Sequence, residues 1–465
     1  MQERVAMGGN LQEVEQKVNR DLLISVTGSV PRRFWVAVAL MAFLAAAGFG
    51  AAGYVVAQGL GATGLNRPVM WAFFITNFVF WIGISHAGVM LSAILRLAQA
   101  EWRRPATRAA EIVTIFSLVN AMLFPIIHTG RPWRTLYWAF PYDFGRGIWP
   151  NVRSPLIWDP SAIITYLTSS VLFVYVALIP DIAVARDRTT GIRHQFYSVL
   201  ALGWRGYPRQ WRLQIIAGFL LSALILPIFV SVHSIVSWDF AVNQSVEGWH
   251  STIFAPYFVI GAVHSGVSAV VTVMIILRFL FKWEDYIRPE HMDALGRLLI
   301  VVAITWFYFF AMEVTFGLFT LENAELGLRS MQFFETPYST LFLVFIIAAF
   351  FFPVPMWMFK NVRRSFFWMT ITTISVNIGM WLERFLIIIP GLARKQPLSF
   401  SWSTYAPSVP EILMVVGSFG FVGMSILLFA KVFPLIPIYD VKEGEILRRE
   451  MKIGKVTIPA VLREE

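Results

Sequence analysis

The chain contains no cysteine. Thiolate-bound zinc, iron–sulfur clusters, covalently attached c-type haem and disulfide bonds all require cysteine, so this sequence can supply none of them. Charged residues are also scarce: they make up 14% of the 465 residues, whereas 57% are hydrophobic. A soluble domain typically carries about 25% charged residues. The shortage of charge therefore excludes an ordinary soluble protein and indicates an integral membrane protein.

Long uncharged segments support this interpretation. Residues 34–66 and 68–95 contain no Asp, Glu, Lys or Arg. Each segment exceeds the roughly 20 residues with which a helix crosses a bilayer, and in lipid the backbone must close its own hydrogen bonds. We therefore predict an all-α membrane protein with a transmembrane helix in each of ten apolar runs: about 34–58, 70–95, 108–128, 161–182, 213–234, 253–278, 297–319, 338–359, 365–390 and 410–433.

The distribution of basic residues predicts the orientation. An even number of spans places both termini on one side of the membrane, and the connections on that side hold 17 Lys and Arg against 8 on the other. Because cytoplasmic loops are rich in Lys and Arg, we expect the terminal segments 1–33 and 434–465 to lie in the cytoplasm. The protein itself is expected in the inner membrane of a bacterium. The net charge of +10 has the same origin, so no nucleic-acid partner is expected.

The sequence contains an internal repeat. "HAGVMLSAILR" runs from His86 to Arg96, and "HSGVSAVVTVMIILR" runs from His264 to Arg278. The two copies lie in the second and sixth spans, so they have the same orientation in the membrane. Within a membrane domain of residues 34–433, this predicts two parallel four-helix bundles at about 70–234 and 253–390, flanked by the first and last helices. In each copy, the glycine two positions after the histidine permits close helix approach.

Ionisable side chains within the spans are few, and each is costly in a bilayer unless it has a partner or a function. They are His86, His128, His233, His264, Glu313, Glu383 and Arg384, with Asp159 and Asp239 at helix ends. His86 and His264 are either structural hydrogen-bonding groups or steps of a proton path, and as axial ligands they would also suit one haem. Glu383 and Arg384 form either an internal ion pair or part of the same path. Apart from His128 and Asp159, we assign these residues to a candidate proton path: His86, His233, His264, Glu313, Glu383, Arg384 and Asp239. We expect no haem or metal.

His128 and Asp159 suggest a site at the outer face. His128 ends the third span in "FPIIHTGRPWR" and Asp159 begins the fourth in "PLIWDPSA". An interfacial histidine and an N-capping aspartate would explain both residues. The alternative is a quinol site, because an imidazole and a carboxylate can accept the two protons that a hydroquinone releases. The loop 129–160 is rich in aromatic residues, and further wall residues would be Arg131, Tyr142 and Trp158.

These features together resemble a known family. The ten spans, the paired bundles, the two His-x-Gly-Val motifs, and "PIIHTGRPWR" with "WDPSA" are similar to the polysulfide-reductase-type (NrfD) family of quinone-reactive membrane subunits. The resemblance covers residues 34–433. Within the family, the length and the long loop 129–160 are most similar to the ActC-type subunit of alternative complex III.

The resemblance implies a respiratory or photosynthetic function. It implies oxidation of quinol, with menaquinol as the expected type, near the outer face by His128 and Asp159. It also implies electron transfer to a peripheral iron–sulfur subunit and then to c-type cytochrome subunits. Further expected partners are other membrane subunits, including a paralogue, and lipids. Proton conduction or translocation is the least direct of these implications.

Two other functions also fit ten helices with buried charges. A secondary transporter would show an internal repeat, but helices of such proteins are broken by Gly or Pro near the midplane of both halves. That pattern is not evident in the sequence. The third interpretation is a membrane anchor for a related molybdopterin and iron–sulfur oxidoreductase.

Overall fold

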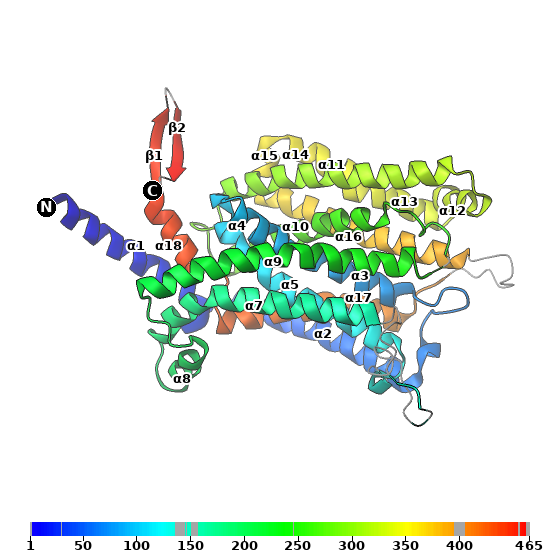
Figure 1. The fold of residues 1–465 in the computed structure, drawn as a ribbon, viewed down its shortest axis with the longest axis horizontal. Coiled ribbons are helices and arrows are strands. Elements are labelled where there is room, and N and C mark those ends of the chain that lie inside the picture. Colours follow the sequence, from blue (N-terminus) through cyan, green and yellow to red (C-terminus); the bar gives the residue numbers. More distant parts are fainter. Residues whose placement is uncertain are drawn as a thin grey trace.

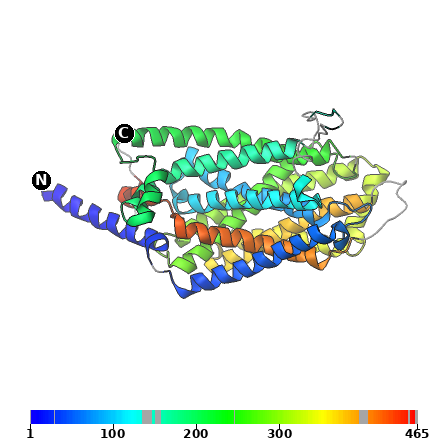
Figure 2. The ribbon, with the colours of Figure 1, turned by 90° about the horizontal axis from the view of Figure 1, so that it is seen from below.

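The structure is a computed structural model that describes residues 2–28, 30–134, 145, 147–149, 157–244, 246–394, 405–453 and 456–461. Its long helices run side by side in an elongated bundle, with both termini at one end (Figure 1). The view from below shows the same arrangement (Figure 2). We call the opposite end of the bundle, where α5 ends and α7 begins, the distal end.

The helices are α1 (Gln2–Thr27), α2 (Arg32–Gln58), α3 (Ala72–Ser85), α4 (Leu95–Leu97), α5 (Arg104–His128), α7 (Trp158–Arg186), α8 (Gly191–Leu200), α9 (Pro208–Ala241), α10 (Phe254–Phe281), α11 (Pro289–Phe319), α12 (Asn323–Phe334), α13 (Tyr338–Ile346), α14 (Pro353–Met358), α15 (Lys360–Arg363), α16 (Phe366–Ala393), α17 (Val409–Val432) and α18 (Ile438–Leu447). Two π-helical segments, Val89–Ile94 and Ile347–Phe351, interrupt this series. In the C-terminal tail, β1 (Arg448–Ile453) pairs with β2 (Val456–Val461) in an antiparallel hairpin.

Helix length and composition agree with a membrane protein. Among the described residues, nine helical segments are long and apolar enough to cross a bilayer, and the shorter apolar α3 accounts for the remaining predicted span. The prediction of a helical membrane protein with about ten spans is confirmed. The chain is a multi-pass integral membrane protein.

The second predicted span, 70–95, is not a single α-helix, contrary to the expectation. α3 ends at Ser85, and the chain continues through a turn at His86 into the π-helical segment. The carbonyl oxygen of Ser85 accepts hydrogen bonds from the hydroxyls of Thr114 (2.5 Å) and Tyr166 (3.1 Å), and the Thr114 hydroxyl also accepts one from the Gly88 amide (2.9 Å). Backbone groups freed by a break in lipid must find partners, and these side chains supply them.

The glycines of the repeated motif lie at close helix contacts. A Cβ on Gly266 would lie 2.9 Å from the backbone nitrogen of Ala87, and one on Gly88 would overlap the Thr114 side chain. Only glycine allows backbones to approach this closely. The expectation for these two residues is confirmed, and they bring the segment after α3 against both α10 and α5.

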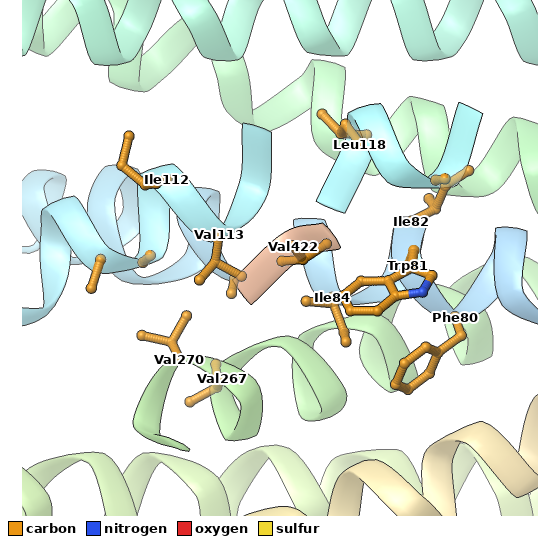
Figure 3. Packing of buried hydrophobic residues seen from close by; sticks show 14 of the residues in the cluster. Phe80, Trp81, Ile82, Ile84, Ile112, Val113, Leu118, Val267, Val270 and Val422 are labelled. Atoms are coloured by element: carbon orange, nitrogen blue, oxygen red, sulfur yellow. The ribbon is translucent and has the colours of Figure 1, made fainter. Parts of the chain in front are cut away.

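The core between these helices is apolar. Trp81 and Ile84 of α3, Val113 of α5, Val267 of α10 and Val422 of α17 are buried side chains of one cluster (Figure 3). The segments that meet there are up to about 340 residues apart in the sequence. In lipid such contacts hold helices together by close packing, because the acyl chains are as apolar as the side chains.

The flanking helices α2 and α17 pack against each other through small residues. A Cβ on Gly48 of α2 would lie 2.7 Å from the Cα of Gly417 on α17. Next to Gly417, the Ser418 hydroxyl accepts a hydrogen bond from the indole nitrogen of Trp81 at 2.9 Å. The pair of flanking helices is thereby fixed to α3.

The α2–α17 contact predicts a position-specific effect of mutation. Gly48→Val should destabilise the protein by about 1–3 kcal/mol, because the larger side chain separates the two backbones. Gly53→Val on the same helix is the matched control, since a Cβ there has no neighbour within 4 Å. Thermal unfolding of the detergent-purified variants measures the difference. Equal melting temperatures for the two valine variants would contradict the contact.

Candidate functional site

For position only, we call helices α3 to α9 the first bundle and α10 to α16 the second bundle. His128 is the last residue of α5 and lies at the distal end of the first bundle. Its ring stacks on Phe74 of α3, with centroids 5.3 Å apart and an angle of 16° between the planes. Its Nδ1 atom is buried and has no hydrogen-bond partner within the described part of the chain. The imidazole therefore has a flat apolar support and a nitrogen free to bind a ligand.

Asp159 lies in the first turn of α7, with the carboxyl group of Asp239, near the end of α9, as a charged neighbour. Its Oδ1 atom is buried without a partner among the described residues, whereas Asp239 Oδ1 accepts a hydrogen bond from the Asn243 amide at 2.8 Å. Two neighbouring carboxyl groups repel each other when both are ionised, which favours one proton held between them. The pair can thus take up and release a proton.

The structure corrects the N-cap interpretation of Asp159. α7 begins at Trp158, its N-cap residue is Ile157, and no side-chain hydrogen bond caps it. Asp159 therefore faces the neighbouring helix α9 instead of the end of its own helix. A carboxylate in the first turn still interacts favourably with the helix dipole.

The other predicted wall residues differ in how far they are buried. Trp158 is half-buried at the start of α7, next to Asp159, whereas Arg131 is exposed. Tyr142 lies outside the described residues. The sequence did not single out Phe74, which lies within an apolar run and carries no local signal.

A second pair of titratable groups lies deeper in the first bundle. The rings of His86 and His233 are 4.4 Å apart between centroids, and Phe229 packs on His86. His86 Nδ1 lies 2.7 Å from the carbonyl oxygen of Ile82, while its Nε2 atom and both nitrogens of His233 have no partner in the part of the chain that the structure describes. Two adjacent imidazoles with three nitrogens that lack partners among the described residues form a buried polar pair.

His264, the repeat mate of His86, has a different environment. It lies in the unbroken helix α10, and its ring stacks on Trp306 at 5.6 Å. Its Nε2 atom lies 3.2 Å from the carbonyl oxygen of Ala349. His86 thus faces a second histidine, whereas His264 is held within the second bundle.

The second bundle contains a buried ion pair. Glu383 and Arg384 are both almost fully buried, and Arg384 Nη1 lies 3.0 Å from Glu383 Oε2. Glu383 Oε1 accepts hydrogen bonds from the Tyr257 hydroxyl and from the Trp306 indole nitrogen. The ion pair, one of the two interpretations of Glu383 and Arg384, is present, and aromatic donors from two helices bind its carboxylate.

Glu313 is paired with a residue that the sequence analysis did not select. Arg329 of α12 lies 3.4 Å from Glu313 Oε1 and 3.2 Å from the amide oxygen of Gln332. A cavity of about 30 Å³ beside them is lined also by Glu383. A space of this size holds a water molecule or two, which can bridge the two glutamates.

A further buried cluster, at the terminal end of the first bundle, was also not predicted. Arg108 lies 3.2 Å from both Glu111 and Asp181, and the Ser92 hydroxyl donates to Glu111 at 2.5 Å. The spacing of Arg108 and Glu111, three residues apart on one helix, is a signal that could have identified this cluster.

Asp440 on α18 has a pKa below its usual value. Burial alone would raise this pKa, but nearby arginines, led by Arg103, have the larger effect and lower it.

The fold and these sites define a multi-pass membrane protein with titratable groups buried in its interior. Comparison with protein families identifies this class more closely. The family model of polysulphide reductase NrfD matches residues 61–395. The chain therefore belongs to the NrfD family of polysulphide-reductase membrane subunits. The matched region contains helices α3 to α16 and excludes the flanking α2 and α17.

Three relatives belong to reductases or oxidoreductases. A protein of Halobacterium salinarum, assigned as a membrane subunit of dimethyl sulfoxide reductase, is 29% identical over 60% of each chain. A subunit of the selenate reductase of Mesobacillus selenatarsenatis is 22% identical over 84% of this chain and 91% of its own length. The Hdr-like menaquinol oxidoreductase integral membrane subunit of Archaeoglobus fulgidus is 23% identical over 88% of this chain and 96% of its own. These relatives support a function within a redox complex.

The buried ion pair of the second bundle gives a direct prediction. Tyr257→Phe should lower stability by about 1.5–3 kcal/mol, because it removes a hydrogen bond to a charged group in a buried site. Tyr308→Phe on the exposed side of α11 is the control and should change stability little. Thermal unfolding of both variants in detergent measures this. A Tyr257→Phe protein as stable as the Tyr308→Phe protein would show that the bond to Glu383 contributes nothing.

Proposed function

We propose that the chain is the quinol-binding membrane subunit of an oxidoreductase complex and that quinol is oxidised at the distal end of its first bundle. The observation that carries the proposal is the pair of open acceptors there, His128 Nδ1 and Asp159 Oδ1, both buried and without partners among the described residues. A buried polar atom without a partner costs free energy unless a ligand or water satisfies it. The two hydroxyl groups of a quinol are suitable donors.

The surroundings of these acceptors suit a quinol ring. His128 lies on the face of Phe74, and nearby on the same end Phe240 and Trp71 pack with Trp249 in an aromatic cluster. Aromatic and apolar walls with a few polar groups are typical of small-molecule sites. The relative from Archaeoglobus fulgidus, a menaquinol oxidoreductase subunit by name, supports menaquinol as the substrate.

The reaction requires two proton acceptors and an electron acceptor. A neutral imidazole at His128 takes one proton, and the carboxyl pair of Asp159 and Asp239 takes the other. The two electrons leave to another chain, because no cysteine is present to hold an iron–sulfur cluster here. We propose a peripheral iron–sulfur subunit at the distal end, followed by c-type cytochromes, as in a complex of the alternative complex III type.

The quinol site is tested by changing its two acceptors. Asp159→Asn and His128→Gln should each lower quinol oxidation by the assembled complex by roughly 100-fold, the usual contribution of general base catalysis. Quinol oxidation with an artificial electron acceptor, followed over pH 6 to 9, measures the effect. Asp159→Asn retains the shape of the side chain but cannot accept the proton.

Matched controls exist in the same chain. Asp187→Asn lies just beyond the other end of α7, and His250→Gln is an exposed histidine near the end of α9; both should retain the wild-type rate. Wild-type rates in assembled Asp159→Asn and His128→Gln complexes would show that this site assignment is wrong.

We further propose that the deeper titratable groups conduct protons. In the first bundle the adjacent imidazoles of His86 and His233 would form one step, and in the second bundle His264, Glu313 and the pair Glu383–Arg384 would form others. The open nitrogens of the histidine pair support this, because a proton relay needs groups that can exchange partners. The role of Glu383 and Arg384 as an ion pair alone is the simpler alternative.

His86→Phe tests the first step. The variant should keep quinol binding and lose proton movement in reconstituted vesicles, because phenylalanine fills the space but cannot carry a proton. His194→Gln, an exposed histidine of α8, is the control. Unchanged proton stoichiometry in a well-assembled His86→Phe complex would remove this residue from the path, and loss of assembly would favour a structural role.

We propose that the distal end faces the outside of the cell and that both termini lie in the cytoplasm. A cysteine at Gly145, in the connection between α5 and α7, should react with a membrane-impermeant thiol reagent on intact cells. A cysteine at Gly444 in α18 should react only after lysis. The reverse labelling pattern would overturn both the orientation and the outward quinol site.

A further inference from the structure

The short helix α8 presents apolar side chains on two opposite faces. One face packs on the protein: Tyr197 is buried, and its hydroxyl donates to the carbonyl oxygen of Val432 on α17 at 2.7 Å. The opposite face carries four apolar side chains at helical spacing that are 46–85% exposed: Ile192, Phe196, Val199 and Leu202, the last in the turn that follows the helix. An apolar row on a firmly held helix requires an apolar neighbour.

The position of α8 sets the depth of this row. α8 lies at the same end of the bundle as both termini (Figure 1). The charged run Arg186, Asp187 and Arg188 precedes it, and Arg205 and Arg209 follow it. Because charged side chains avoid the hydrocarbon core, α8 lies at the level of the lipid headgroups, with its row in reach of the acyl chains.

Most charged residues in the segment around α8 are basic. Residues 187–212 contain five arginines and one acidic residue, Asp187, which is paired with Arg186. Arg205, Arg209 and Arg212 are exposed, and among the described residues no acidic side chain pairs with them. Basic residues beside an amphipathic helix at this level attract anionic headgroups.

We propose that α8 and the start of α9 form a binding surface for anionic phospholipid. The phosphate groups contact Arg205, Arg209 and Arg212, and the acyl chains cover the row of α8. A lipid fits better than a protein partner, because only a lipid offers a negative group and a hydrocarbon chain in this order along the membrane normal. The surface is independent of the quinol site, which is at the other end of the helices.

The full-length chain, purified in detergent, tests the proposal by titration with phosphatidylglycerol and phosphatidylcholine and counting of bound lipid by native mass spectrometry. The wild-type chain should prefer phosphatidylglycerol. The triple variant Arg205→Gln, Arg209→Gln, Arg212→Gln should lose roughly 100-fold of the affinity for phosphatidylglycerol, since each basic residue near a membrane surface contributes about fivefold. Ile192→Ser with Val199→Ser should weaken binding of both lipids.

Two controls keep the test decisive. Removing three exposed charges elsewhere, with Arg32→Gln, Arg134→Gln and Lys360→Gln, should preserve the preference, and Arg→Lys at the three α8-side positions should preserve it too. The lysine variant also separates loss of charge from loss of folding. Equal affinity of the wild-type chain for both lipids, or an unchanged preference in the triple glutamine variant, would overturn the proposal.

Discussion

The hydroxyl of Thr114 holds together the segment on which the interior of the protein depends. It donates to the carbonyl oxygen of Ser85 and accepts from the amide of Gly88, and so bridges the break in the second membrane span. In water a broken helix would hydrogen-bond to solvent, but in lipid these groups have only the protein. The break turns His86 toward His233 and places Ala87 against Gly266 of α10. The histidine pair and the contact between the bundles thus share one local cause.

The two bundles differ in how their buried polar groups are paired near the distal end. In the second bundle the short helix α12 lies at the distal end, and its Arg329 pairs with Glu313 of α11. In the first bundle the described part of the corresponding region leaves acceptors on His128 and Asp159 without partners. Paired buried charges satisfy each other, whereas buried acceptors without partners beside aromatic side chains favour a ligand. This difference among the described residues supports the proposed placement of the quinol in the first bundle.

The sequence predicted the helices well because bilayer thickness and the absence of charge determine them locally. All ten apolar runs are helical for most of their length, and the glycines of the His-x-Gly motif lie at the close contacts that their lack of a side chain suggested. The break at His86 was missed because its cause, Thr114 on another helix, is 28 residues away. Apolar composition alone does not distinguish a continuous helix from one whose backbone is completed by a neighbour.

For the candidate site, the sequence determined which residues are chemically unusual, and the tertiary structure decided which of them meet. The cost of an ionisable group in lipid singled out His128, Asp159, His86 and Glu383 without any knowledge of the fold. Only packing joined Asp159 to Asp239, His86 to His233, and Glu313 to Arg329. These partners lie on different helices, at separations of 80, 147 and 16 residues. Which faces of two helices meet depends on the shapes of all the side chains between them, and no local pattern in the sequence carries that information.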